Sequence, residues 1–250
     1  MMADLLYRGS NAIGLRRLPT DIAGWPQERE LAATTLTPAD RRLYEATWRE
    51  FRREFGLLGG SARKPAGWAA DLRFRQKASL LRVAGNVDFA EDLLLAGQQV
   101  AVSVAYLETS TMLVQALGDR GWRVGEINGR ATAEVNEATR IAFHMGQLDV
   151  IAFTVTELIS LHSNEMLGGD RPRSLIVHDM RHSAIQLQQV EGRYHCDGER
   201  AVVYYAFAED TVEERIAARA VARMAAMHGM AGDDTVALDE LATFLDAEPR

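Results

Sequence analysis

From about residue 99 onward, short apolar runs alternate with segments of helical periodicity. The apolar runs are rich in Val, Ile and aromatic residues, as β-strands are, and they are 99–104, 122–127, 148–153, 174–178 and 201–207. The segments between and after them repeat apolar residues every three or four positions, as helices do, and they are 107–120, 132–145, 184–194 and 211–227. This alternation predicts βαβ units, and therefore an α/β, three-layer fold whose parallel sheet is covered by helices on both faces. Ligands in such sheets usually sit at the carboxyl ends of the strands.

The first hundred residues predict helices and a loop. Thr37-Pro38-Ala39-Asp40 supplies an N-cap, a proline at the first helical position and an acid in the first turn, which starts a helix that runs to about Phe55. Residues 56–67 contain Gly, Ser and Pro, as loops do, and a further helix is expected over 72–95. We therefore expect an N-terminal arm and helix over 1–70, an α/β lobe over 71–230 and a tail over 231–250.

The composition is that of a globular protein, with 47% hydrophobic and 25% charged residues in a chain of 250. No run approaches the roughly 20 apolar residues that span a bilayer, and MMADLLYRGS lacks the order of a secretory signal. The single cysteine, Cys196, excludes an internal disulfide framework and a zinc ribbon. These features predict a cytoplasmic protein without a membrane partner.

The charge is unevenly distributed along the chain. Residues 1–82 hold 15 Arg or Lys against 9 Asp or Glu, whereas residues 83–250 hold 13 against 26, and the net charge is −7. A basic arm on an acidic body could bind nucleic acid locally. An amphipathic arm with a solvated arginine face explains the same numbers, and both interpretations stay open.

The run from Gln189 to Gly198, QVEGRYHCDG, ends a predicted helix, passes through a glycine turn and precedes a strand. It resembles motif VI of superfamily 2 helicases, QxxGRxxRxG, and Gln189, Gly192, Arg193 and Gly198 match that pattern. The next segment, AVVYYAFAEDTVEERI, is similar to the end of the second lobe in Swi/Snf-type ATPases. Cys196 stands where the pattern has its second arginine, the usual arginine finger.

Other segments resemble the same lobe in the same order. Residues 99–117 are similar to the strand and helix of motif IV, 127–129 match the turn after the second strand, and 150–161 occupy the place of motif V. The resemblance extends over about residues 15–228 and is nearest to Swi/Snf-like proteins encoded by phages. It implies a RecA-like parallel sheet over 71–230, the helicase C-terminal lobe, preceded by a helical N-terminal arm.

The resemblance also implies roles for individual residues. In this superfamily one lobe supplies a phosphate loop, a lysine and a magnesium-binding acid, and the second lobe supplies arginines across the cleft. By this analogy Arg193 faces the γ-phosphate and Gln189 orients that phosphate or the attacking water. The other implied positions are Gly192, Gly198 and Glu157 at the nucleotide, and Ser103, Arg130 and Thr154 near the DNA strand. The usual glycines of motif V are absent, and Thr154, Thr156, Glu157, Ser160 and His162 occupy that region; these polar residues could equally cap the next helix.

What the sequence lacks limits the activity that can be expected of it. A phosphate loop needs a Gly-Lys pair, and the chain contains none. We therefore expect no ATP hydrolysis by the chain alone, and binding of ATP and Mg²⁺ only in complex with a partner chain that carries the N-terminal lobe. His178 and His182 straddle a strand end without a third ligand, so no metal site of the chain's own is expected.

Two further possibilities stay open. The chain could be a degenerate, non-catalytic helicase lobe that binds nucleic acid or protein, or a piece of a longer helicase. A separated lobe exposes apolar surface, so self-association is also expected. The resemblance to phage proteins places the chain in a bacterial or phage-infected cell.

Overall fold

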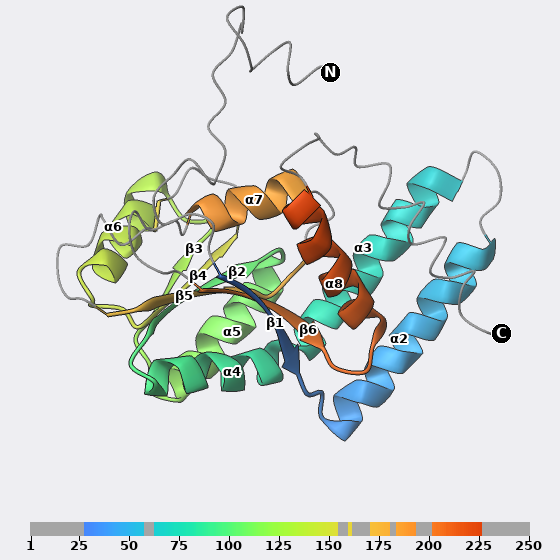
Figure 1. Cartoon of the computed structure of the whole chain (residues 1–250), viewed down its shortest axis with the longest axis horizontal. Coiled ribbons are helices and arrows are strands. Elements are labelled where there is room, and N and C mark those ends of the chain that lie inside the picture. Colours follow the sequence, from blue (N-terminus) through green and yellow to red (C-terminus); the bar gives the residue numbers. More distant parts are fainter. Residues whose placement is uncertain are drawn as a thin grey trace, which may run out of the picture.

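The computed structural model describes residues 28–57, 63–154, 160–161, 171–180, 184–193 and 202–226 (Figure 1). Its strands are β1 Glu28–Thr34, β2 Gln99–Val104, β3 Val124–Ile127, β4 Val150–Thr154, β5 Arg173–Val177 and β6 Val202–Ala208. Its helices are α2 Pro38–Leu57, α3 Arg63–Leu81, α4 Val83–Leu95, α5 Leu107–Asp119, α6 Ala133–His144, α7 Ala184–Arg193 and α8 Val212–Ala226.

The six strands form one sheet in the order β1-β6-β5-β2-β4-β3, and every neighbouring pair is parallel. Alternate residues of each strand face opposite sides, because the side-chain period of a strand is two. Ala101, Ile151 and Leu175 pack on one side with α6, α7 and α8, whereas Val100 and Val102 pack on the other with α4 and α5. The predicted three-layer α/β fold is therefore confirmed, as are the five predicted parallel strands.

A third apolar cluster joins the α2–α3 hairpin to the end of the sheet. Aromatic rings from both helices lie against one another, with Phe51 and Phe74 stacked at 5.4 Å between ring centroids. Ala208 at the end of β6 and Val212 at the start of α8 belong to the same cluster. The hairpin is thus anchored at the carboxyl end of the sheet, where α2 and α3 lie beside α8 (Figure 1).

The structure differs from the sequence prediction in the first hundred residues. β1 was not predicted, and it pairs with β6 over its whole length, from Glu28 opposite Val202 to Thr34 opposite Ala208. The helix predicted over 72–95 is two helices, because the chain turns at Arg82. The predicted loop over 56–67 is shorter, since α2 continues to Leu57 and α3 begins at Arg63.

Within the described ranges, no helix combines the length and apolar character that crossing a bilayer requires. Residues 1–27 of the predicted arm and the predicted tail lie outside the described residues.

Candidate functional site

α7 carries the residues that the sequence assigns to the nucleotide, and it has one buried and one exposed face. Leu187 and Val190 are fully buried in the apolar core under the helix. Gln189 and Gly192 are exposed. Arg193 is the last residue of α7, four positions after Gln189, and residues at i and i+4 lie on one side of a helix. The backbone therefore places Arg193 above the exposed Gln189.

Glu191 fixes the rotation of this helix end. Its carboxylate is fully buried and accepts two parallel hydrogen bonds from Arg29 of β1, at 2.7 and 2.8 Å. The Tyr205 hydroxyl of β6 donates a third, at 2.7 Å. A buried carboxylate with three charge-assisted or hydroxyl donors has few alternative arrangements. Because Glu191 is held inward, Gln189 and Gly192 stay on the outer surface of α7.

The remaining nucleotide positions of the prediction, Gly198 and Glu157, lie outside the described residues, as does Cys196.

The residues that the sequence assigns to DNA all lie at the carboxyl edge of the sheet, but they do not form one cluster. Ser103 in β2 pairs with Phe153 of β4, and Val104 pairs with Thr154. Ser103 and Thr154 therefore occupy neighbouring strands but point to opposite faces of the sheet. Ser103 is fully buried, so its hydroxyl is not open to a phosphate in this structure; Thr154 is 6% exposed.

Arg130 is exposed in the turn that follows β3. Asn128 builds this turn, because its side-chain oxygen accepts a hydrogen bond from the Arg130 backbone N–H at 2.8 Å. The Asn136 side chain on α6 donates to the Asn128 carbonyl at 2.9 Å. A short polar side chain that bonds its own backbone two residues later is a common turn device. The turn therefore presents the Arg130 side chain to solvent on a fixed backbone.

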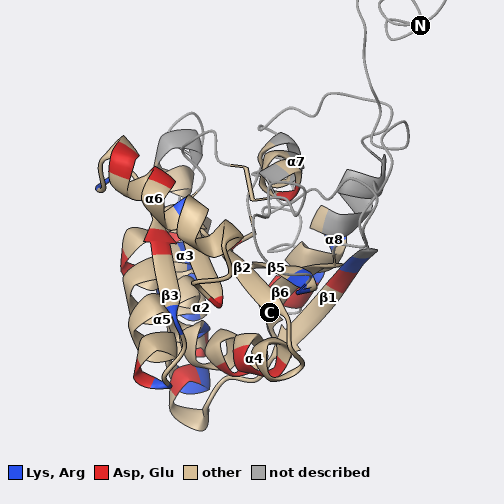
Figure 2. Ribbon diagram, turned by 90° about the vertical axis from the view of Figure 1, so that its left-hand side faces the viewer, with Lys and Arg blue, Asp and Glu red and all other residues tan. Residues whose placement is uncertain are grey.

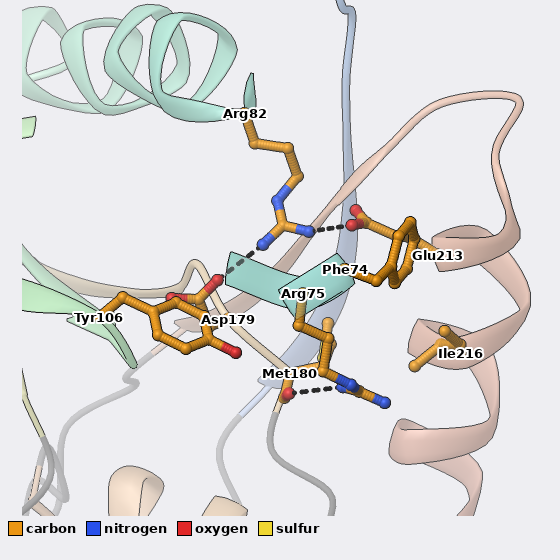
Figure 3. Close-up of a pocket in the computed structure, with 8 residues that line it drawn as sticks. All are labelled: Phe74, Arg75, Arg82, Tyr106, Asp179, Met180, Glu213 and Ile216. Carbon is orange, nitrogen blue, oxygen red and sulfur yellow. Dashed lines mark hydrogen bonds and ion pairs between the residues drawn. The ribbon is translucent and has the colours of Figure 1, made fainter. Parts of the chain in front are cut away.

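A buried ionic cluster that the sequence did not predict lies at the carboxyl end of β2, β5 and β6 (Figure 3). Arg82, at the junction of α3 and α4, donates to the Asp179 carboxylate and to the His178 carbonyl, both at 2.8 Å, and forms an ion pair with Glu213. Asp179 in turn accepts from the Ala105 backbone N–H at 2.7 Å. The side chains of Arg82, Asp179 and Glu213 are each less than a tenth exposed.

The protonation of this cluster follows from its surroundings. Burial lowers the pKa of His178, which favours the neutral ring. The ring bonds the Asn86 amide at 2.8 Å and the Ser79 carbonyl at 2.9 Å, so a single tautomer satisfies both nitrogens. Burial opposes ionisation of Asp179, but the charge of Arg82 and the hydrogen bond from the Ala105 backbone N–H lower the pKa of that carboxyl. Asp179 is therefore ionised and paired.

The cluster closes the crevice in which α/β sheets usually hold ligands. The chain leaves β2 towards β3 on one side and leaves β5 towards β6 on the other, so the connections diverge between β2 and β5. Such a divergence normally opens a binding crevice at the carboxyl edge. Here Ser79 of α3 and Arg82 at the α3–α4 junction fill it, and a small pocket beside Arg82 lies between Phe74, Tyr106 and Ile216 (Figure 3). No sequence motif signalled this, because Arg82 lies within a continuous helical pattern.

Among the described residues, no group of three or more His, Cys, Asp or Glu side chains could hold a metal ion.

No protein-family model matches the chain, and no curated protein sequence does either. Solved structures do match it. The SWI2/SNF2 ATPase core domain of Sulfolobus solfataricus covers 84% of this chain at a TM-score of 0.64 and 13% identity, and this chain covers 46% of that core, or about half its length. The same core in complex with dsDNA matches at a TM-score of 0.60 and 15% identity, over 76% of this chain and 42% of that one.

Structures of isolated C-terminal halves match over most of their own length. The C-terminal domain of the Sulfolobus solfataricus SWI2/SNF2 ATPase has a TM-score of 0.59 and 13% identity, and it covers 85% of this chain while this chain covers 93% of it. The C-terminal part of the Fun30 ATPase domain has a TM-score of 0.57 and 9% identity, with 78% and 88% covered. At sequence identities this low, the structural similarity establishes the fold alone. The chain therefore has a RecA-like fold similar to that of the C-terminal domain of SWI2/SNF2 ATPases.

Proposed function

We propose that this chain is the second lobe of a DNA-dependent ATPase of the helicase or translocase type, and that a partner chain supplies the lobe with the phosphate loop. Its fold is that of the C-terminal half of two-lobe cores, one of which was solved in complex with dsDNA. The sequence has no Gly-Lys pair with which to build a phosphate loop of its own. The chain can therefore complete a cleft but not hold the triphosphate alone.

The end of α7 carries this proposal. The buried Glu191 fixes the helix so that Gln189 faces outward, and the backbone puts Arg193 on the same side. Phosphoryl transfer is accelerated mainly by positioning and by cations set against the charge that develops on the phosphoryl oxygens. A guanidinium is always charged and offers its donors in a fixed plane, which suits that task. In our proposal Arg193 faces the γ-phosphate and Gln189 orients it or the attacking water.

The exposed polar face of α7 fits a nucleotide gripped from the opposite side of a cleft. ATP with Mg²⁺ would supply the transferable phosphoryl group. The partner lobe would hold both, since no described group of side chains in this lobe could hold a metal ion. Gly192, Gly198 and Glu157 would line the nucleotide side of this lobe, and Arg130 and Thr154 the DNA side, whereas the hydroxyl of Ser103 is buried in the sheet. The single cysteine favours action in a reducing cytoplasm, and the resemblance to phage-encoded proteins favours that of a bacterium or a phage-infected cell.

A second candidate is a non-catalytic helicase lobe that binds nucleic acid or protein. Cys196 favours it, because a thiol cannot replace the guanidinium that the family pattern has at this position. Where an arginine finger is fully used, its loss lowers the rate by roughly 10³–10⁵.

The test is DNA-stimulated phosphate release by a mixture of this chain with an N-terminal helicase lobe that carries a phosphate loop, which is to be sought first in the adjacent reading frames. We expect turnover by the mixture and none by either chain alone. Arg193→Ala should abolish turnover, whereas Arg73→Ala, a change in an exposed ion pair far along the chain, should leave it unchanged. An inactive mixture that Cys196→Arg activates would identify the non-catalytic lobe. An active mixture that Arg193→Ala leaves unaltered would contradict the assigned site.

Self-association belongs to the same proposal, because a lobe without its partner leaves apolar side chains in water. Leu95, Leu43 and Leu72 are 73%, 56% and 55% exposed. Equilibrium sedimentation should give a mass above that of one chain, and addition of the partner lobe should lower self-association. A monomer at all concentrations would contradict this part.

A further inference from the structure

α2 is amphipathic, and its outer face carries a row of arginines. The inner face packs into the cluster shared with α3, and its buried residues are Tyr44, Thr47, Phe51 and Phe55. Arg42, Arg49 and Arg53 are exposed. Their spacing of seven and four residues places them on one line along the helix, since 3.6 residues make one turn. We call these residues the α2 arginine row.

No carboxylate among the described residues forms an ion pair with the α2 arginine row. Neighbouring cations differ in this respect: Arg73 of α3 pairs with Glu54 at 2.5 Å, and Lys77 of α3 pairs with Glu50 at 3.1 Å. Those two acids of α2 are thus turned towards α3 and away from the row. Glu45 lies on the flank of the row and forms no ion pair with it within 4 Å. The row therefore presents to solvent three guanidinium groups that form no ion pair with a described carboxylate.

The length of the row suits a chain of phosphates. Arg42 and Arg53 are eleven residues apart, which corresponds to about 16 Å of helix at 1.5 Å per residue. That length matches roughly five steps of a nucleic-acid strand at 3.4 Å each. Arginine donates in a planar fork that matches phosphate oxygens, and such charge-assisted hydrogen bonds are the stronger ones.

The residues after position 82 are acidic on balance. Residues 83–250 hold 13 Arg or Lys against 26 Asp or Glu, and Figure 2 shows acidic residues along α4 and α6. This acidic balance weakens the general attraction of a polyanion to the part of the chain outside the proposed DNA side, whereas the outer face of α2 carries the α2 arginine row. Because the α2 arginine row is positive and the rest of the chain is acidic on balance, a nucleic acid would contact the outer face of α2 locally.

We propose that the α2 arginine row binds the phosphate backbone of a nucleic acid without reading its bases. Contacts from arginine to phosphate fix position and carry no sequence information. This contact needs neither ATP nor a partner lobe and lies outside the motifs of the proposed cleft, so it goes beyond the proposed function.

The experiment measures binding of a short fluorescein-labelled DNA duplex to the isolated chain by fluorescence anisotropy, without nucleotide, between about 50 and 200 mM salt. The variant Arg42→Gln/Arg49→Gln/Arg53→Gln removes the row. The matched control Arg73→Gln/Lys77→Gln/Arg120→Gln removes the same charge from cations that are already paired with carboxylates. Exposed substitutions of this kind change stability little, and thermal unfolding of both variants checks that each is folded.

We expect the row variant to bind at least about tenfold more weakly and the slope of log K against log salt to fall by up to about 3. The control variant should stay within about twofold of the wild type. Two duplexes of unrelated sequence should bind equally. Equal losses in both variants would overturn the proposal, as would unchanged binding by the row variant. So would competition by polyglutamate as effective as unlabelled duplex, because the row would then be a general anion surface. The assay contains no partner lobe, so failure of the ATPase mixture leaves its result intact.

Discussion

The guanidinium of Arg29 and the carboxylate of Glu191 meet through two parallel hydrogen bonds although 162 residues separate them in the chain. The pair ties the edge strand β1 to the last turn of α7. Burial and the Glu191 carboxylate raise the pKa of the Tyr205 hydroxyl far above its ordinary value, so that hydroxyl remains a donor to the same carboxylate. The edge strand thereby helps to set the orientation of the helix that carries Arg193.

Arg29→Gln should destabilise the fold by about 3 kcal/mol, because it leaves a buried carboxylate without its cation. Urea unfolding measures the loss. Arg73→Gln is the control, since its ion pair with Glu54 is exposed on both sides, and it should cost less than about 1 kcal/mol. Similar losses for the two variants would show that the Arg29 pair is no stronger than a surface one.

Arg82→Met should damage the fold at least as much as Arg29→Gln, with a loss of about 3–5 kcal/mol. The substitution leaves the buried carboxylates of Asp179 and Glu213 without their cation. The triple variant Arg82→Met/Asp179→Asn/Glu213→Gln removes all three charges and keeps the side-chain oxygens that accept from backbone N–H groups. It should therefore be more stable than Arg82→Met in urea unfolding. A triple variant no more stable than the single one would contradict this account of the cluster.

Asp149 should make the fold sensitive to acid. Hydrogen bonds from Arg123, at 2.7 and 2.8 Å, outweigh burial and, with Arg171, lower the pKa of this carboxyl well below its ordinary value. A carboxyl whose pKa is lower in the folded state contributes stability above its unfolded pKa, and that contribution is lost as the pH falls towards the folded pKa.

Asp149→Asn should accordingly cost about 2 kcal/mol at about pH 7 and progressively less towards about pH 3. Unfolding free energies of the two proteins across that range measure the difference. A difference that is constant with pH would assign the effect to packing rather than to the charge.

Two glycines in helices should respond to alanine with opposite sign. Gly118 of α5 has no atom within 4 Å of the position that a Cβ would occupy. Gly118→Ala should therefore stabilise the fold by about 0.5 kcal/mol through helix propensity and chain entropy. A Cβ on Gly85 of α4 would lie 3.0 Å from the Thr34 Cβ and 3.2 Å from the Thr35 carbonyl oxygen. Gly85→Ala should destabilise, and a higher melting temperature for this variant would contradict the close packing of α4 on β1.

The parallel sheet could be predicted from the sequence because its central strands are buried on both faces. β2, β4 and β5 are buried at every position, and such strands appear as continuous apolar runs rather than as alternating patterns. β1 could not be predicted in the same way. Its sequence, ERELAAT, consists largely of helix-favouring residues, and it is a strand because it pairs with β6 and meets Glu191.

The break at Arg82 and the early start of α3 were missed for related reasons. The apolar pattern around Arg82 is continuous, and it is tertiary partners, Asp179 after β5 and Glu213 in the first turn of α8, that bind its side chain in the interior. Pro65 and Gly67 suggested a loop, yet proline is tolerated in the first turn of a helix. Gly67 lies in α3 where a Cβ would come within 3.1 Å of the Phe55 ring. The glycine allows close packing of α3 on α2 at this point, and the proline is compatible with the first turn of α3.

The candidate site at the end of α7 was predicted from the sequence, and the structure adds the buried Arg29–Glu191 pair that anchors this helix. The exposed position of Gln189 follows from the helical period that the sequence already contained. The hydrogen bonds from Arg29 to Glu191 could not be inferred, since Arg29 lies in the unpredicted strand β1. Ser103 was expected near the DNA strand, but its side chain is fully buried. It lies in β2, a central strand between β5 and β4, where a short polar side chain does not reach the surface.

The edge position of β1 has a consequence for how the chain acquires its structure. Among the described strands, β1 pairs only with β6, the last of them in sequence, and the Thr34 hydroxyl donates to the Phe207 carbonyl across 173 residues of sequence. Contacts of such separation carry a large loop-closure entropy and slow folding. During synthesis β1 cannot form this pairing until β6 has left the ribosome. The contact between Arg29 of β1 and Glu191 of α7 is therefore expected to form late in folding, after the central strands have assembled.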